Sequence, residues 1–394
     1  MNINNRFLYP LILFFLLLCL SNAGAATKTW TGSGANALAS TPANWSDNAV
    51  PADGDDIVLD SPSTKDMTWD LDINIQTWIQ DGYEGTVTVA TVFSPDGFSN
   101  LNILGNCTIK SGTWTHQGAQ QNEINRLSVS VGGNLEIGTY GKINVAGKGY
   151  ATGKGPGGTS GVNGGSYGGR GHAASKPCYG SIMAPTNIGS GGGYGSGGGA
   201  IRLAITGQLI HNGLINAESM TIGYPTGAGG SIWLTFASLH GDGTINANGL
   251  TGAGGGRISL TATEPGYDFS EFTGVISAKG GSSTSYKGAG GTIYLENESD
   301  GFGKGRVIVE ASGGSGSNYT DFNADVKETV FHKLIFREGG HFALGSNHLI
   351  EVSGVWSNLA MFTGLPGATV SFTDRYQDTS SIYGGGFVNL VATN

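Results

Sequence analysis

The stretch that decides the fold is "GAGGSIWLTFASLHGDGTINANGLTGAGGGRISLTA", which runs from Gly227 to Ala262. It holds two kinds of short apolar strand, typified by "SIWLTF" and "TINA", together with paired glycines and very few charged residues. Within each strand the side chains alternate with the two-residue period of β-structure. Because segments this short cannot bury their own apolar face, they need copies of themselves to stack on. The stretch therefore predicts a repeating β-coil.

Both strand types recur along the chain in a fixed alternating order. Copies of the first type begin at Gly141, Gly213, Gly243, Gly274 and Gly305, and the last four are spaced 30, 31 and 31 residues apart. Copies of the second type begin at Gly198, Gly229, Gly255 and Gly290.

Alignment of these copies predicts columns of like side chains that point inward. The first type has one column of Ile143, Ile215, Ile245, Ile276 and Val307, and a second of Val145, Ala217, Ala247, Ala278 and Val309. The second type has columns of Ile201, Ile232, Ile258 and Ile293, and of Leu203, Leu234, Leu260 and Leu295.

The repeat predicts an all-β fold, namely a parallel β-helix, a right-handed solenoid with glycine-rich turns. Consecutive coils would lie about 4.8 Å apart. Glycine accounts for 70 of 394 residues, and we expect it to supply positive φ angles in sharp turns. A β-propeller is the alternative, but it needs hairpin signals such as Asn-Gly, which are scarce. Collagen is excluded because there is no Gly-X-Y period.

One segment breaks the rhythm. The interval from Gly141 to Gly213 is 72 residues, against about 31 elsewhere. We assign the excess, about residues 147–199, to one long Gly/Ser-rich loop, whose composition favours flexibility.

The first 26 residues are typical of a secretory signal peptide. Arg6 precedes an apolar run from Leu11 to Leu20, and the small residues Ala23 and Ala25 form an A-x-A-like cleavage site. The sequence therefore predicts a secreted, extracellular or cell-surface protein. Loss of Arg6 would move the formal net charge from −9 to −10. The remainder divides into 27–125 (N-terminal cap and first coils), 126–330 (glycine-rich repeats) and 331–394 (C-terminal coils, with an incomplete last coil as an alternative).

Composition limits the partners and the chemistry. An acidic chain with no basic run is a poor partner for nucleic acid or for anionic lipid. No segment after the signal has 18 uncharged apolar residues, so we expect no membrane span in the mature chain. Two cysteines remain there, Cys107 and Cys178. In an oxidising compartment they either form a disulfide or stay as separate thiols.

The N-terminal flank carries a family resemblance. From Lys28 it reads "KTWTGSGANALASTPANWSDNAVPADGDDIVLD". Its W-T-G…N-W…P…D-D pattern resembles segments of bacterial surface and autotransporter-type β-helix proteins, and later stretches such as "FHKLIFREGGHFALGSNHLIEVSGVWSN" resemble their repeats. The matching residues are Trp30, Thr31, Gly32, Asn44, Trp45, Pro51, Asp55 and Asp56. The resemblance implies a β-helix and a family that includes adhesins, passengers and some carbohydrate-active enzymes.

One candidate site follows the outward side of the first strand type. Glu218, Asn248, Lys279 and Glu310 occupy one position on successive copies. Lys279 and Glu310 are weak catalytic candidates, as an acid/base pair of the kind that polysaccharide lyases use. The alternative, which we favour, is a solvated ladder with one exposed ion pair, worth about 0–1 kcal/mol.

A second candidate site follows the outward side of the second strand type. Arg202, Trp233, Ser259 and Tyr294 align there. Exposed aromatic rings on a flat sheet can stack on sugars, which makes Trp233, Tyr294 and Arg202 candidates for ligand binding. The alternative is that the long loop covers them.

Residue spacing predicts no cofactor or metal site, and a Ca²⁺ site is the alternative. "ADGDDIVLD" from Ala52 and "DFNADV" from Asp321 are acidic enough for Ca²⁺, but neither has EF-hand or nonapeptide spacing. The leading hypothesis is a secreted non-catalytic surface protein, structural or adhesive, with glycans or cell-surface components as partners. The alternatives are a carbohydrate-binding or lyase-like β-helix protein and a fibre subunit that self-associates through its solenoid ends.

Overall fold

The computed structural model describes residues 25–63, 65–93, 97–118, 120–174, 176–220, 224–310, 318–337, 339–359, 361–373, 381–383 and 390–392. The predicted signal therefore lies almost entirely outside the described residues. The chain is all-β, with sheets that are parallel except at one pair of strands. Two short 3-10 turns, Pro42–Asn44 and Glu298–Asp300, are the helical elements of the described residues.

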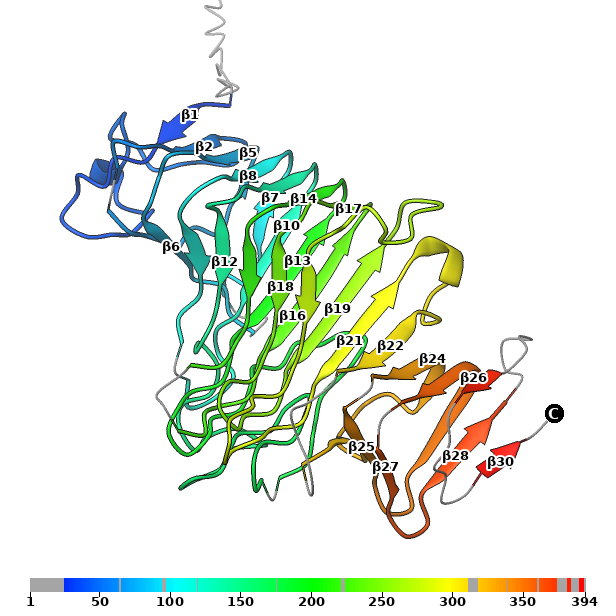
Figure 1. Ribbon diagram of the computed structural model, residues 1–394. Coiled ribbons are helices and arrows are strands. Elements are labelled where there is room, and N and C mark those ends of the chain that lie inside the picture. The colour runs from blue at the N-terminus through cyan, green and yellow to red at the C-terminus, as the bar shows by residue number, and fades with distance from the viewer. Residues whose placement is uncertain are drawn as a thin grey trace, which may run out of the picture.

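Two seven-stranded parallel sheets form two sides of the N-terminal and central parts (Figure 1). Sheet I contains, in spatial order, β1 (Thr27–Thr29), β2 (Asp56–Leu59), β5 (Thr77–Gln80), β8 (Cys107–Ile109), β11 (Leu135–Ile137), β14 (Leu209–His211) and β17 (Leu239–His240). Sheet II contains β3 (Met67–Trp69), β6 (Thr86–Val89), β9 (Thr113–Thr115), β12 (Lys142–Asn144), β15 (Leu214–Asn216), β18 (Thr244–Asn246) and β20 (Val275–Ser277).

The third sheet extends from β4 to β30, the last described strand. Sheet III contains β4 (Asn74–Ile75), β7 (Leu101–Ile103), β10 (Leu127–Val131), β13 (Ala200–Ile205), β16 (Ser231–Phe236), β19 (Arg257–Ala262), β21 (Thr292–Glu296), β22 (Arg306–Val309), β24 (Val330–Phe336), β26 (Leu349–Asn358), β28 (Thr369–Phe372) and β30 (Leu390–Ala392), with β29 (Ser381–Tyr383) paired to β26. Sheet IV, in the C-terminal part, contains β23 (Thr320–Phe322), β25 (His341–Leu344) and β27 (Met361–Gly364).

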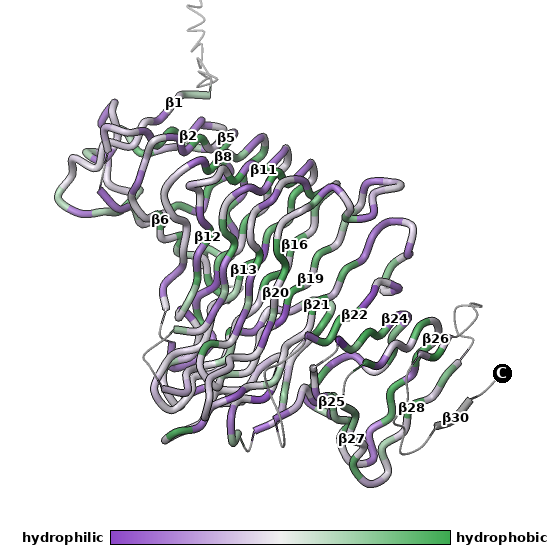
Figure 2. Tube along the Cα trace, in the orientation of Figure 1, coloured by the Kyte–Doolittle hydropathy of each residue, from purple (hydrophilic) through white to green (hydrophobic). Residues whose placement is uncertain are grey.

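The chain visits these sheets in a cyclic order. From β4 to β18 it passes through sheets III, I and II in turn, five times, and each pass pairs in parallel with the one before. We call one such pass a round. Figure 2 shows hydrophobic residues along central strands such as β16 and many hydrophilic residues in the connecting turns.

The predicted columns are confirmed where parallel pairing continues. Ile143, Ile215, Ile245 and Ile276 are successive partners in sheet II. Ile201, Ile232, Ile258 and Ile293, and likewise Leu203, Leu234, Leu260 and Leu295, are successive partners in sheet III. Most of these side chains are fully buried, and so is Ala247 in the second column of the first strand type.

The prediction is wrong at "GRVIVE". Val307 does not follow Ile276 in sheet II, and Val309 does not follow Ala278. Instead β22 turns back and pairs antiparallel with β21 in sheet III, with Val307 opposite Tyr294. The connection includes the 3-10 turn Glu298–Asp300, which a side-chain capping box at Asn297 holds, and no further round is completed at this point.

A row of tryptophan side chains fills the N-terminal core. Trp30, Trp45, Trp69, Trp78 and Trp114 are each at most 1% exposed. Neighbouring rings pack edge to face with centroid separations of 5.4, 6.5, 5.3 and 5.0 Å. Such pairs add to the apolar burial that large rings provide. Two of the residues that carry the family resemblance, Trp30 and Trp45, therefore act as core.

Close packing, and not turn geometry, explains many of the repeated glycines. A Cβ added at Gly254 would lie 1.8 Å from the carbonyl oxygen of Gly169, and one at Gly168 would lie 2.1 Å from that of Gly256. Neither glycine has a φ in the left-handed region. The expectation that glycine supplies positive φ in sharp turns holds at positions such as Gly252, whereas elsewhere glycine lets two backbones touch.

The long loop is folded into this packing and is not free. We define the glycine bundle as residues 147–199 together with 225–230, 250–256 and 286–291, which lie at the lower end of the stacked rounds in Figure 1. The run 226–229 hydrogen-bonds to four other runs, through Gly165, Ser190, Gly198 and Gly254. A strand in a sheet has two neighbours, so this run belongs to a three-dimensional bundle. The flexibility expected from composition is therefore not what the structure shows.

Among the described residues, no helix is long and apolar enough to cross a membrane.

Candidate functional site

The outward row of sheet III lies where the sequence predicts it, but much of it is covered. Arg202, Trp233, Ser259 and Tyr294 are successive partners across four strands. Trp233 is half-buried, and the Arg202 guanidinium lies 5.0 Å from its ring centroid. Ser259 is fully buried, and its hydroxyl donates to the Met183 carbonyl at 2.6 Å. The long loop thus covers part of this face.

Tyr294 is a correction to the predicted sugar-binding face. It is 2% exposed and packs in a core cluster with Cys178 and Val307. Its hydroxyl donates to the Glu296 carboxylate and accepts from the Gly305 backbone N–H at 3.2 Å. The hairpin that β22 forms therefore closes over the ring, and the predicted pair of open aromatic rings is reduced to Trp233.

A second outward row ties the loop to sheet III. The Ser231 hydroxyl donates to the Asn187 carbonyl at 2.5 Å, and Arg257 Nε donates to the Tyr179 carbonyl at 3.1 Å. Arg257 is fully buried, and its guanidinium lies 5.5 Å from the Tyr167 ring centroid. These side chains do not face solvent, because they hold the loop against the sheet.

The predicted pair Lys279 and Glu310 is split between solvent and core. Asn248 links the outward column, since it donates to Glu218 at 3.4 Å and accepts from the Lys279 backbone N–H at 2.7 Å. Lys279 is exposed. Glu310 is 1% exposed and accepts from Arg337. A carboxyl this buried cannot meet a polymeric substrate directly.

Burial raises the pKa of Glu310, although Arg337 and Lys279 oppose that shift. One carboxylate oxygen, Oε2, has no hydrogen-bond partner within the described part of the chain. The group therefore carries an energetic cost when ionised.

The considered disulfide is not formed. Cys107 and Cys178 are buried free thiols, the first in β8 and the second in the loop. Burial raises the pKa of both thiols above the ordinary value. Both are therefore protonated at neutral pH and poorly reactive.

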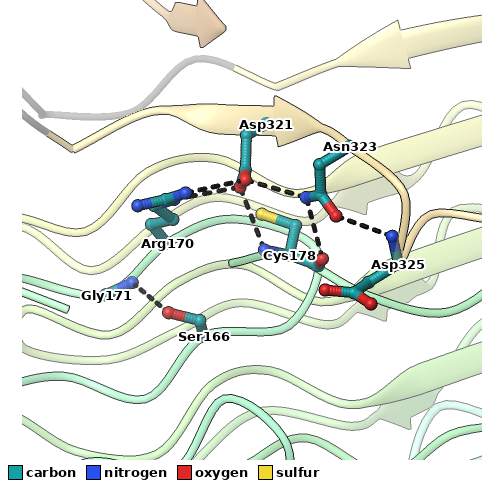
Figure 3. Close-up of polar contacts among 7 residues, drawn as sticks. All are labelled: Ser166, Arg170, Gly171, Cys178, Asp321, Asn323 and Asp325. Carbon is teal, nitrogen blue, oxygen red and sulfur yellow. Dashed lines mark hydrogen bonds and ion pairs between the residues drawn. The ribbon is translucent and has the colours of Figure 1, made fainter. Parts of the chain in front are cut away.

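An ion pair joins the loop to sheet IV (Figure 3). Arg170 donates from Nε and Nη2 to the two carboxylate oxygens of Asp321, at 3.1 and 2.9 Å. The same carboxylate accepts from the Cys178 backbone N–H at 2.9 Å and from Asn323 Nδ2 at 2.8 Å. The Asp321 side chain is only 3% exposed. Its hydrogen-bonding capacity is used, so the pair acts as a joint between two segments distant in sequence.

Two more carboxylates, from residues outside the loop, bind to it. Glu123 accepts from the Ile188 backbone N–H at 2.8 Å. Glu328 accepts from the Ile182 backbone N–H at 2.8 Å and from the Ser181 hydroxyl. Burial raises the pKa of Glu123. Together with Asp321, these groups fix the loop at three points between residues 178 and 188.

In both acidic runs considered for Ca²⁺, groups of the protein itself bind a carboxylate. At "DFNADV" the positive charge beside Asp321 is the guanidinium of Arg170. At "ADGDDIVLD", Asp55 accepts from the backbone N–H groups of Ala26 and Ala52, both at 2.9 Å. No group of three potential metal ligands occurs in the described ranges.

Sequence reasoning missed a groove at the corner between sheets I and II. Its volume is about 730 Å³, and it is lined by turns from successive rounds. The lining includes three acids and two lysines beside one exposed ring: Asp81, Glu84, Lys110, Glu136, Tyr140 and Lys142. The available signal was turn length, because the connections between these sheets differ in length from round to round.

No protein-family model matches the chain, and no curated protein or solved structure matches it either.

Proposed function

We propose that this chain is a secreted, non-catalytic protein with a structural or adhesive role, built as a right-handed parallel β-helix. The observation that carries the proposal is the use of the outer face of sheet III. There Ser231, Arg257 and Ser259 all donate to carbonyl groups of the long loop. Polar groups that an enzyme would turn toward substrate are thus engaged in holding the protein together.

The cyclic order of sheets III, I and II supports the β-helix. Rounds that pair in register from β4 to β18 share one apolar interior, which is the physical basis of solenoid stability. The right hand is the usual one for crossovers between parallel strands. A stiff body of this kind suits display or attachment at a surface.

Secretion and the surface role rest on the sequence. The Arg6 and Leu11–Leu20 pattern supports export, and the W-T-G…N-W resemblance supports an adhesin-like, autotransporter-like family. N-terminal sequencing of protein released by a producing cell should begin at Ala26 or Thr27. Protein that stays in the cytoplasm with Met1 intact would contradict export.

The catalytic alternative is tested by product analysis. The purified protein is incubated with polyuronates and neutral polysaccharides, and unsaturated products and new reducing ends are measured. We expect neither to accumulate above a boiled-protein control. Accumulation that is lost in the Lys279→Ala variant would overturn the non-catalytic assignment.

A further inference from the structure

The corner groove exists because the turns between sheets I and II alternate in length. Five residues, 81–85, connect β5 to β6, whereas three, 110–112, connect β8 to β9. Four residues, 138–141, connect β11 to β12, and two, 212–213, connect β14 to β15. The short turn at 110–112 therefore lies between two longer ones, which form walls around it.

The groove runs across the stacked rounds. Four consecutive turns are separated by three interstrand spacings of about 4.8 Å, so the groove is roughly 14 Å long. Nζ of Lys110, in the floor, lies 3.4 Å from Oδ2 of Asp81, in the wall, and both side chains remain about half exposed. The ion pair crosses from one round to the next and leaves both partners open to a ligand.

Tyr140 stands on the second wall and is 77% exposed. A ring so exposed buries little apolar surface on folding, so its face remains open to a ligand. An exposed tyrosine offers an apolar face and a polar tip, which is a common combination at binding surfaces. By contrast, Trp78 and Trp114, in the two preceding rounds, are fully buried.

We propose that the corner groove binds a neutral polysaccharide, with Tyr140 stacked on a sugar ring. This inference rests on the proposed adhesive function and names its ligand class. Carboxylates of Glu84 and Glu136 can accept from sugar hydroxyls, and the ammonium groups of Lys110 and Lys142 can donate to them.

The lining disfavours other ligands. Three carboxylates against two ammonium groups repel an acidic polymer such as a polyuronate. A lipid or an apolar peptide would need hydrophobic walls, but the side chain of Tyr140 supplies the one large apolar surface of the lining. An extended peptide would need a free sheet edge, whereas the strands that flank these turns are paired on both sides by the neighbouring rounds.

The test is affinity electrophoresis of the full chain in native gels that contain dextran, laminarin or mannan. Gels with alginate or polygalacturonate serve as the acidic comparison. We expect retardation by at least one of the three neutral polymers and none by the acidic ones. The Tyr140→Ala variant should bind about tenfold more weakly, and Glu136→Gln should also bind more weakly. Tyr194→Ala, which removes a 44% exposed ring outside the groove, should bind like the wild type.

Three results would overturn the inference: no retardation by any neutral polymer, equal retardation of wild type and Tyr140→Ala, or preferential retardation by the acidic polymers. As a control, each variant should unfold at the same denaturant concentration as the wild type, which would show that a loss of binding is confined to the groove. The assay is separate from the proposed function, because release of sugar fragments would contradict a non-catalytic protein without affecting the groove. If cells retained the Tyr140→Ala variant at their surface, the adhesive role would stand, but binding of a neutral polysaccharide in this groove would not explain it.

Discussion

Replacement of Gly254 by alanine tests whether glycine serves backbone packing. The added Cβ would lie 1.8 Å from the Gly169 carbonyl oxygen, and real Cβ contacts are essentially never shorter than 3.0 Å. The two runs must therefore separate by 1.2 Å, the difference between those values. Gly254 donates to the Gly165 carbonyl and accepts from the Gly229 N–H, each at 3.0 Å, and that movement would break or stretch both bonds.

The magnitude follows from these contacts. Two lost hydrogen bonds cost about 1 kcal/mol each, and overpacking of a close-packed site costs about 1–3 kcal/mol more. The reduced entropy of the unfolded chain returns less than about 1 kcal/mol. We expect Gly254→Ala to lower the free energy of unfolding by about 3 kcal/mol, as measured by denaturant titration.

Gly161→Ala is the matched control, because Gly161 belongs to the same glycine bundle as Gly254 but makes no such close contact. Gly161 has a φ of +63° and nothing within 4 Å of its Cβ position, so alanine there meets only the left-handed penalty of about 1 kcal/mol. A Gly254→Ala protein as stable as wild type, or no less stable than Gly161→Ala, would refute the packing argument.

Three further predictions concern buried ionisable groups. Asp321→Asn should lower the free energy of unfolding by about 3–5 kcal/mol, because it leaves the Arg170 charge poorly compensated. Limited proteolysis should then cut within 171–199. A loss below about 1 kcal/mol would contradict the claim that this ion pair joins the loop to sheet IV. Burial lowers the pKa of His116 and of His211 to about 4. Each should therefore contribute stability that is present above pH 6.5 and lost as the pH falls toward 4, up to about 3 kcal/mol each. His116→Gln should reduce this acid-induced loss by about half, and an equal loss in wild type and variant would contradict the role of His116. Glu310 has a raised pKa, so its contribution has the opposite sign: relative to Glu310→Gln, wild type should gain stability as the pH falls toward 4.5, and a relative loss would show that its ion pair with Arg337 outweighs burial.

The repeats were predictable where neighbours in space are equivalent positions in sequence. The column through Ile215, Ile245 and Ile276 follows from alternation and spacing alone, because each copy needs the next to bury its apolar face. The pattern failed at Val307, since apolar alternation is the same in a parallel strand and in one that turns back. The connection before β22 is held by a capping box between Asn297 and Asp300, and such a box caps a turn without setting the direction of the strand that follows it.

The covering of sheet III was not predictable from local pattern. The side chain of Tyr294 alternates outward as that of Trp233 does, but only Tyr294 lies beneath the hairpin. Likewise the composition of 147–199 indicates a flexible chain, and its order depends on contacts with residues as distant as Asp321 and Glu328. The exposed ring of Tyr140 had a sequence signal in the unequal turn lengths, but it lies outside both aligned strand types.

Cysteine cross-linking across adjacent rounds tests the central claim of in-register stacking most directly. Leu214 and Thr244 are partners on neighbouring strands of sheet II, at a separation of about 4.8 Å that a disulfide can span. The double variant Leu214→Cys, Thr244→Cys should cross-link rapidly under mild oxidation. Leu214→Cys with Val275→Cys, one strand further along the sheet, should not, because about 9.6 Å exceeds the reach of the bond. Equal cross-linking of both pairs, or of neither, would contradict the stacked rounds.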